Sequence, residues 1–330
     1  MTVRILRADR AAVTLAARML AEGKIVAFPT ETVYGLGADA GNVAAVERIF
    51  EAKRRPADHP LIVHVPDLPS AKRWAALPPQ AIALANAFWP GPLTLIAPRA
   101  AHVHDVVTGG QSSVGLRVPS HPVAHALLQE FGNGIAAPSA NRFGHVSPTL
   151  ARHVADDLGD AVDLILDGGG CAIGIESTIV AFASGGAMLL RPGAIGADAI
   201  ATVLGAPLAT ADATAPRASG TLMSHYAPRT PAQLVVYDVL RAELAQLEGR
   251  DERVAVLARS AEPPEGFDGV WLAAPQDAQD YARALYANLR ALDDANADVI
   301  LVESVPQDPA WAAIQDRLER ATTGVDDDSD

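Results

Sequence analysis

Short apolar runs alternate with amphipathic helical patterns along most of this chain, and that alternation limits the folds it can adopt. In the first 205 residues, strand-like runs occur at 24–30, 60–65, 93–98, 114–119, 134–139, 164–169, 177–183 and 187–193. Helical patterns occur between them, at 14–23, 42–53, 70–77, 79–89, 121–131 and 148–158. This arrangement predicts an α/β domain with a mixed sheet.

The alternation stops at residues 207–232, which are rich in Ala, Thr and Pro and too poor in large apolar residues to form a core. Strand-like runs then return at 232–238, 253–258, 269–274 and 298–304, with helical patterns at 278–295 and 309–321. We therefore predict a first domain at 1–206, a linker at 207–232 and a smaller α/β domain at 233–330.

Composition narrows the class of protein. At 330 residues the chain is long enough for two domains, and its single cysteine, Cys171, excludes an internal disulfide framework. No apolar stretch is long enough for a membrane span, and the first ten residues lack a signal-peptide core. We expect a soluble cytoplasmic protein without membrane contact.

The net charge of −13 is unevenly distributed. Residues 1–205 carry 16 basic and 17 acidic side chains, whereas residues 206–330 carry 10 and 22 and end in "VDDDSD". The acidic second part would repel a phosphate backbone, so we expect no stable binding of nucleic acid.

The segment "PTETVYGLGADA" at 29–40 satisfies a short dinucleotide-binding pattern through Gly35, Gly37 and Ala40. That interpretation needs a helix directly after the glycines and an acidic residue near 55–60, where the chain instead has "KRRPAD". A tight turn using the two glycines at positive φ is a second interpretation. A third is a ligand pocket at a strand end, where α/β sheets bind ligands.

The run "KRRPADHPLIVHV" contains three consecutive cations in an otherwise charge-balanced domain. Such a run is often a solvated face, but Lys and Arg are also suited to phosphate oxygens. His64 at the end of this run, taken alone, is more typical of a core histidine.

Three further stretches place polar side chains at turns. "AAPSANRFGHVSPT" contains Ser139 and Asn141, which favour ligand contact, and Ser147, which also fits a helix N-cap before Pro148. "GIESTIV" contributes Ser177, and "LLRPG" contributes Arg191. The chain has no P-loop pattern and no convincing zinc site, so ATP chemistry would require another type of fold.

These stretches, together with "WPGPLTLI" and "VGLRVPSHP", occur in the order found in the YrdC/Sua5 family. The chain resembles the two-domain Sua5 form of that family over about residues 8–205, with several independent motifs. The likeness continues through "SHYAP" into the C-terminal domain, where it is one of architecture. The resemblance implies a YrdC-like twisted mixed sheet with an open concave pocket, and a smaller Rossmann-like α/β domain.

The resemblance also implies an enzyme that joins L-threonine, bicarbonate and ATP into threonylcarbamoyl-adenylate and releases pyrophosphate. This is the first step of the t6A modification of tRNA, and the product would pass to a tRNA threonylcarbamoyltransferase. The positions that match threonine-binding positions of the family are Thr32, His64, Arg117, Ala137 and Ser177. Those that match ATP-contacting positions are Lys53, Arg55, His59, Ser113, Ser139, Asn141, Ser147, Arg191 and Tyr226.

Within that set, Lys53 and Arg55 are expected to hold phosphates, with Mg²⁺ accompanying the ATP, and to act catalytically. His59 stands where some relatives carry asparagine, and Arg54 has no assignable role. Glu31 could serve a metal or orient an amine. Residues 207–232 are expected to close over the pocket as a lid with Tyr226 against ATP. The alternative for this segment is a plain tether between two domains. The alternatives for the function are carbamoyl or adenylyl transfer to another acceptor, and an RNA-binding module of the same fold.

Overall fold

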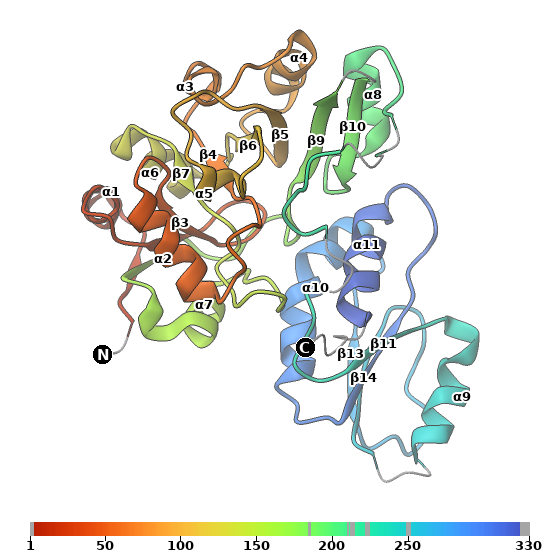
Figure 1. Cartoon of the computed structure of the whole chain (residues 1–330). Coiled ribbons are helices and arrows are strands. Elements are labelled where there is room, and N and C mark those ends of the chain that lie inside the picture. The colour runs from red at the N-terminus through yellow and green to blue at the C-terminus, as the bar shows by residue number, and fades with distance from the viewer. Residues whose placement is uncertain are drawn as a thin grey trace. The chain divides into compact units, whose positions relative to one another are not determined.

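The computed structural model describes residues 3–183, 186–209, 211, 215–221, 225–248 and 252–323 (Figure 1). The chain divides into two compact units, one of Met1–Phe143 with Ser147–Thr221, the other of Gly144–Val146 with Leu222–Asp330. The acidic end at 325–330 lies outside the described residues.

A mixed sheet forms the centre of the first unit, as the alternation predicts. The order among the described strands is β1-β8-β2-β3-β7-β4-β6-β5-β9-β10. Their bounds are Ile5–Arg7 (β1), Val26–Phe28 (β2), Gly35–Asp39 (β3), Ile62–His64 (β4), Leu93–Pro98 (β5), Ser113–Arg117 (β6), Ile135–Ala136 (β7), Leu164–Asp167 (β8), Thr178–Ala183 (β9) and Gly186–Arg191 (β10). Parallel pairs such as β4–β6 and β5–β9 occur beside antiparallel pairs such as β5–β6.

Helices cover both faces of this sheet. Successive residues of a strand point to opposite faces, and here both sets are apolar and packed against helices. Val26 and Phe28 pack in one core with α1 and α6, whereas Ile25 and Ala27 pack in another with α2, α3 and α7. The helix bounds are Arg10–Ala21 (α1), Val43–Lys53 (α2), Leu68–Trp74 (α3), Pro79–Phe88 (α4), Asp105–Thr108 (α5), Pro122–Phe131 (α6), Ala151–Leu158 (α7) and Ala197–Leu204 (α8).

Strand β3 contradicts both the dinucleotide-binding and the tight-turn interpretation of the glycine pattern. Gly35 and Gly37 are strand residues, and neither has a positive φ. The reason for glycine is close packing: a Cβ on Gly37 would lie 2.8 Å from both Ile135 Cγ2 and Phe28 Cε1. The sheet therefore continues through the segment where a loop was expected.

The first half of the linker belongs to the first unit by its contacts. Ala209, Ala215 and Ala218 pack against a small core that contains Ile96 and Ile179. Small side chains therefore cover part of the sheet although the segment lacks the large residues of an independent core.

The second unit is built on a four-stranded parallel sheet in the order β11-β14-β12-β13, which agrees with the four predicted strands. Its elements are β11 (Ala232–Val235), α9 (Tyr237–Glu248), β12 (Val254–Ala258), β13 (Val270–Ala273), α10 (Ala278–Asp293), β14 (Val299–Glu303) and α11 (Ala312–Thr322). Helix α9 was not among the predicted helices. Across the described part of the chain, every helix is too short or too polar to span a bilayer.

Candidate functional site

A polar loop at residues 29–34 connects β2 to β3 and is fixed by its own side chains. The Thr30 hydroxyl accepts hydrogen bonds from the backbone N–H groups of Thr32 and Val33, each at 3.2 Å. It also lies 2.8 Å from the Thr32 hydroxyl and 2.6 Å from the Val33 carbonyl oxygen. These bonds hold the Thr32 hydroxyl in a buried, defined position.

The Thr32 hydroxyl meets a buried arginine from a distant strand. Arg117, the last residue of β6, donates from Nη1 to Thr32 Oγ1 at 2.9 Å and from Nε to the Gly91 carbonyl oxygen at 3.4 Å. Its Nη2 lies 2.7 Å from Glu31 Oε1. The side chains of Arg117 and Glu31 are only 5% and 8% exposed, so this is a buried ion pair within the polar loop.

His64 lies beside Arg117 because β4 and β6 pair in parallel with these two residues in register. Burial, assisted by the charge of Arg117 and opposed by that of Glu31, lowers the pKa of His64 to about 3. His64 is therefore neutral at neutral pH, and its Nδ1 has no hydrogen-bond partner among the described residues. A buried polar atom without a partner is unusual and suggests a group that a ligand satisfies.

Lys53 organises a second loop next to the first. Its Nζ donates at 2.6 Å to the carbonyl oxygens of both Ser139 and Asn141. Desolvation and the positive charge of Arg55 lower the pKa of Lys53 well below its usual range. This loop adjoins the polar loop, since Ala140 N donates to the Tyr34 carbonyl oxygen at 2.9 Å.

Arg55 and His59 both approach the ring of Phe143. The Arg55 guanidinium carbon is 5.4 Å from the ring centroid, and the His59 ring meets it edge-on at 5.1 Å. Desolvation and the charge of Arg55 lower the pKa of His59. Lys53 and Arg55 of the predicted basic run are therefore buried, whereas Arg54 is exposed and is the C-cap of α2 at φ 52°.

Ser177 and Arg191 are in direct contact. Arg191 donates from Nε and Nη2 to the Ser177 carbonyl oxygen at 3.1 and 3.0 Å, and from Nη2 to its hydroxyl at 3.2 Å. The Ser177 hydroxyl is also 2.8 Å from Thr94 Oγ1. Arg191 is 3% exposed and donates from Nη1 to the Ser219 carbonyl oxygen at 2.8 Å.

Ser147 does not cap α7. That helix begins at Ala151 with Leu150 at its N-cap, and the Ser147 hydroxyl instead donates to Glu176 Oε1 at 2.6 Å. The capping interpretation is therefore wrong. Both residues are buried, which makes Glu176 a candidate site residue that the sequence motifs did not identify.

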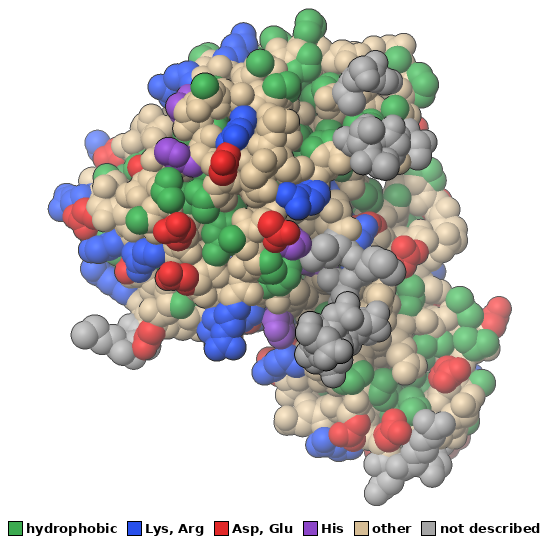
Figure 2. Space-filling model, viewed as in Figure 1, with side chains coloured by type: hydrophobic (Ala, Val, Ile, Leu, Met, Phe, Trp, Pro, Cys, Tyr) green, Lys and Arg blue, Asp and Glu red, His purple; other side chains and the backbone are tan. Residues whose placement is uncertain are grey.

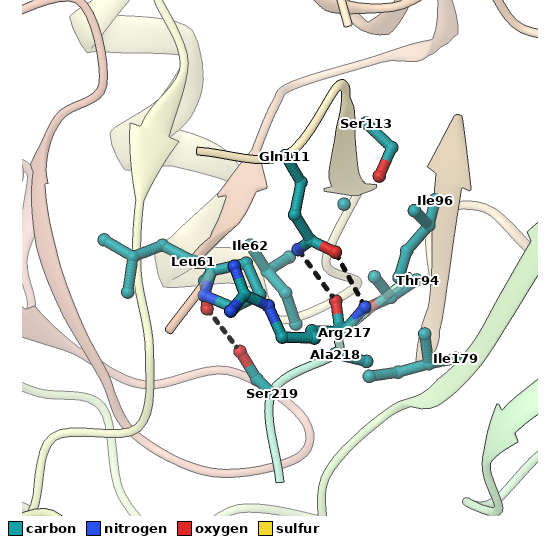
Figure 3. Close-up of a pocket in the computed structure, with 12 residues that line it drawn as sticks. Leu61, Ile62, Thr94, Ile96, Gln111, Ser113, Ile179, Arg217, Ala218 and Ser219 are labelled. Atoms are coloured by element: carbon teal, nitrogen blue, oxygen red, sulfur yellow. Dashed lines mark hydrogen bonds between the residues drawn. The ribbon is translucent and has the colours of Figure 1, made fainter. Parts of the chain in front are cut away.

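A pocket opens between the sheet and residues 217–219 of the linker (Figure 3). Ser113, Gly115 and Thr94 contribute to its wall from β6 and β5. On the other side, Gln111 exchanges two hydrogen bonds with the Arg217 backbone, at 3.1 and 2.7 Å. Ser219 Oγ donates to the Pro60 carbonyl oxygen at 2.8 Å. These hydrogen bonds fix this part of the linker at the wall of the pocket that Ser113 also lines.

Tyr226 lies in the second unit among that unit's own residues. Its ring stacks on Tyr286 at 5.8 Å between centroids, and the Arg317 guanidinium carbon is 5.2 Å from its centroid. Tyr226 has φ 63°, a left-handed conformation that is costly for a residue with a Cβ.

The structure brings most of the predicted site residues together. Arg117 lies beside both Thr32 and His64. The turn at 91–92 links Arg117 to the Ser177 segment, because Gly91 O accepts from Arg117 Nε and Pro92 O accepts from Thr178 N at 3.0 Å. Ala137 lies beside Gly35 and donates to the Ile62 carbonyl oxygen at 2.9 Å. The motifs did not single out Thr94, Glu176 and Ser219, which complete these contacts, whereas Thr30 lies in the polar segment that was predicted to form a ligand pocket.

Comparison with known families matches nearly the whole chain. Residues 18–193 match the YrdC-type domain described as "Telomere recombination", and residues 195–323 match the threonylcarbamoyl-AMP synthase C-terminal domain.

Individual relatives agree. The chain is 39% identical to the threonylcarbamoyl-AMP synthase of Pyrococcus abyssi, with 94% of each chain covered. It is 40% identical to that of Bacillus subtilis, covering 94% of this chain and 92% of the relative. The solved structure of P. abyssi Sua5 complexed with L-threonine superposes with a TM-score of 0.88 at 37% identity, covering 97% of this chain and 96% of that one.

Proposed function

This chain belongs to the Sua5/YrdC family, and from that membership and the site geometry we infer that it is a threonylcarbamoyl-AMP synthase. It joins L-threonine, bicarbonate and ATP into threonylcarbamoyl-adenylate and releases pyrophosphate. The product supplies the threonylcarbamoyl group in the first step of the t6A modification of tRNA.

The observation that carries this conclusion is the buried Arg117 beside the Thr32 hydroxyl. A desolvated guanidinium at the end of a strand is suited to bind the carboxylate of an amino acid, because charge-assisted hydrogen bonds are strongest where water is excluded. The neighbouring hydroxyl and the neutral imidazole of His64 offer polar contacts for threonine. Ala137 and Ser177 complete the proposed threonine site.

The proposed ATP site uses the second loop and the basic run. Its proposed members in the first unit are Lys53, Arg55, His59, Ser113, Ser139, Asn141, Ser147 and Arg191. The low pKa of Lys53 results from burial among cations, so an incoming phosphate would favour its charged form. Arg55, held at the Pro60 carbonyl oxygen at 3.0 Å, adds a second cation near it.

Mg²⁺ enters this proposal with the substrate. Within the described residues, no cluster of three His, Cys, Asp or Glu side chains is arranged to bind a metal. We therefore propose that the ion arrives on the ATP phosphates and that Lys53 and Arg55 share in neutralising them.

The chemistry needs positioning more than a strong protein nucleophile. The amine of threonine and bicarbonate form a carbamate, and a carbamate oxygen attacks the α-phosphorus of ATP with pyrophosphate as leaving group. Fixing the two reactants and neutralising the charge on the phosphates lowers the barrier of such a step. The polar loop and the Lys53 loop adjoin, which would hold threonine and ATP on neighbouring segments.

We further propose that the protein acts in the cytoplasm and that its product passes to a tRNA threonylcarbamoyltransferase. Stable binding of nucleic acid is not part of the proposal. On the face drawn in Figure 2, basic and acidic side chains of the described residues are interspersed, whereas nucleic-acid sites concentrate positive charge.

Pyrophosphate release tests the function. With ATP present, omission of either threonine or bicarbonate should abolish release by the wild-type protein. Release that persists without threonine but requires another amine would support carbamoyl or adenylyl transfer to a different acceptor. Release that is unchanged without either substrate would contradict the synthase function.

A further inference from the structure

The two carboxylate oxygens of Glu31 can accept hydrogen bonds that the interactions described above do not supply. It lies in the polar loop with 6% of its surface exposed, and neither carboxylate oxygen has a hydrogen-bond partner among the described residues. Its contact with Arg117 Nη2, at 2.7 Å, brings the charges together without the alignment of a hydrogen bond. The two charges balance, but Arg117 Nη2 and both Glu31 oxygens form no hydrogen bond within the described residues.

A buried ion pair of this kind is costly to maintain. Desolvation is repaid only when the remaining lone pairs and protons are also hydrogen-bonded. Arg117 uses Nη1 on Thr32 and Nε on Gly91, so Nη2 is the donor left open toward Glu31. The open positions are thus one cationic donor and two anionic acceptors in immediate contact.

An α-amino acid zwitterion complements these open positions. Its carboxylate accepts from a guanidinium, and its ammonium group donates to a carboxylate, one carbon away. Resting on the proposed function, we propose that Glu31 binds the α-ammonium group of threonine and accepts its proton when the carbamate forms.

The proton transfer is balanced as follows. One proton passes from the threonine ammonium to a Glu31 oxygen, which leaves a neutral amine. The nitrogen lone pair forms a bond to the bicarbonate carbon, and a C–O bond of bicarbonate breaks. The departing hydroxyl takes a second proton from nitrogen and leaves as water, so the carbamate carries a single negative charge. Glu31 returns its proton to solvent after the product leaves.

The surroundings of Glu31 explain how substrate could switch its proton affinity. Burial raises its pKa, but the positive charge of Arg117 outweighs burial, so the pKa is below its usual value and the free enzyme holds a carboxylate. The other titratable groups that face it are His64 on β4, His121 before α6 and Cys171 after β8. When the threonine carboxylate shares Arg117, this neutralisation weakens and Glu31 becomes a better base.

The test pairs one residue with one functional group of the substrate. Binding of L-threonine and of (2S,3R)-2,3-dihydroxybutanoate, in which a hydroxyl replaces the ammonium group, is measured by calorimetry on the full chain. The wild-type protein should prefer threonine by at least about 30-fold, the size expected for a desolvated charge pair. In Glu31→Gln that preference should fall to within about threefold.

A role limited to holding Arg117 predicts a different result. Both ligands would then weaken together in Glu31→Gln, and the ratio of their affinities would stay at the wild-type value, which would overturn the inference. Glu130→Gln, an exposed acid on α6, controls for the loss of one negative charge. If Glu31→Gln does not fold, the wild-type protein still decides, because equal affinity for the two ligands would also overturn the proposal.

Kinetics separate proton transfer from binding. At saturating threonine, Glu31→Gln should reduce kcat by about 10²-fold or more, with partial rescue at high pH as free amine becomes available in solution. An unchanged kcat at saturation would refute the proton-accepting role. If the wild-type protein neither binds threonine nor shows threonine-dependent pyrophosphate release, the proposed function fails, whereas failure of the ratio test alone rejects only the role of Glu31.

Discussion

Acidification should destabilise the first unit through His64, because this side chain is buried in its neutral form. Its folded pKa of about 3 lies below the ordinary value of 6.5, so the unfolded chain binds a proton in the intervening pH range and the native state does not. The contribution of His64 to the free energy of unfolding is therefore constant above pH 6.5 and is lost progressively as the pH falls toward 3. The full effect is on the order of 5 kcal/mol, at about 1.4 kcal/mol per pH unit.

Between pH 7 and pH 5, the His64 contribution should amount to about 2 kcal/mol, since only part of the titration range is crossed. This window also avoids Glu31, whose pKa is lowered from 4.5. His59 and His121 have lowered pKa values as well, so the wild-type protein alone cannot isolate His64.

The assay compares wild type with His64→Gln. Urea unfolding at pH 5, 6 and 7 is followed by hydrogen exchange of peptides that cover β4 and β6, which reports the first unit by itself. The variant should lose about 2 kcal/mol less than wild type between pH 7 and pH 5. The exposed His104, changed to glutamine, controls for removal of a histidine. Equal losses in wild type and His64→Gln would refute the assignment of a buried neutral imidazole.

Three other predictions follow from particular contacts. Arg117→Ala should weaken threonine binding by about 2–4 kcal/mol and change the KM for ATP far less, and equal weakening of both would mean that Arg117 supports the pocket generally. Glu303→Ala should destabilise the second unit by about 3 kcal/mol, because the buried Glu303 carboxylate accepts three hydrogen bonds from the backbone N–H groups of residues 259–261, at 2.7, 2.8 and 3.0 Å. Glu303→Gln, which keeps an acceptor oxygen, should cost less, and unfolding measured on second-unit peptides decides between these outcomes. If the linker is a lid, limited proteolysis within residues 215–232 should slow when ATP and threonine are both present, and Tyr226→Phe should lower activity at an unchanged melting temperature. Equal cleavage with and without ligands would indicate a tether.

Much of the fold could be predicted because strand and helix patterns are local. The four strands of the second unit and most strands of the first coincide with short apolar runs. Strand β3 could not be predicted in this way. Its glycines favour a turn by residue type, and only the packing of Phe28 and Ile135 against Gly37 shows why glycine stands within a strand.

The candidate site was predictable in its residues but not in its contacts. The motifs singled out Thr32 and Arg117, yet these lie 85 positions apart, and no local pattern indicates that one hydroxyl meets the other's guanidinium. For Ser147, a local pattern led to a wrong interpretation. Its position before Pro148 is typical of a helix N-cap, whereas a buried carboxylate 29 positions away, Glu176, binds its hydroxyl in the folded chain.

The central claim is that this protein builds threonylcarbamoyl-adenylate from three substrates, and isotope incorporation tests it most directly. The protein is incubated with ATP, L-threonine and ¹³C-bicarbonate, and the nucleotide products are identified by mass spectrometry. The synthase mechanism predicts an adenylate with the mass of threonylcarbamoyl-AMP, heavier by one mass unit than the product from unlabelled bicarbonate. An adenylate that contains threonine without the labelled carbon, or AMP formed with no threonine-containing product, would contradict it.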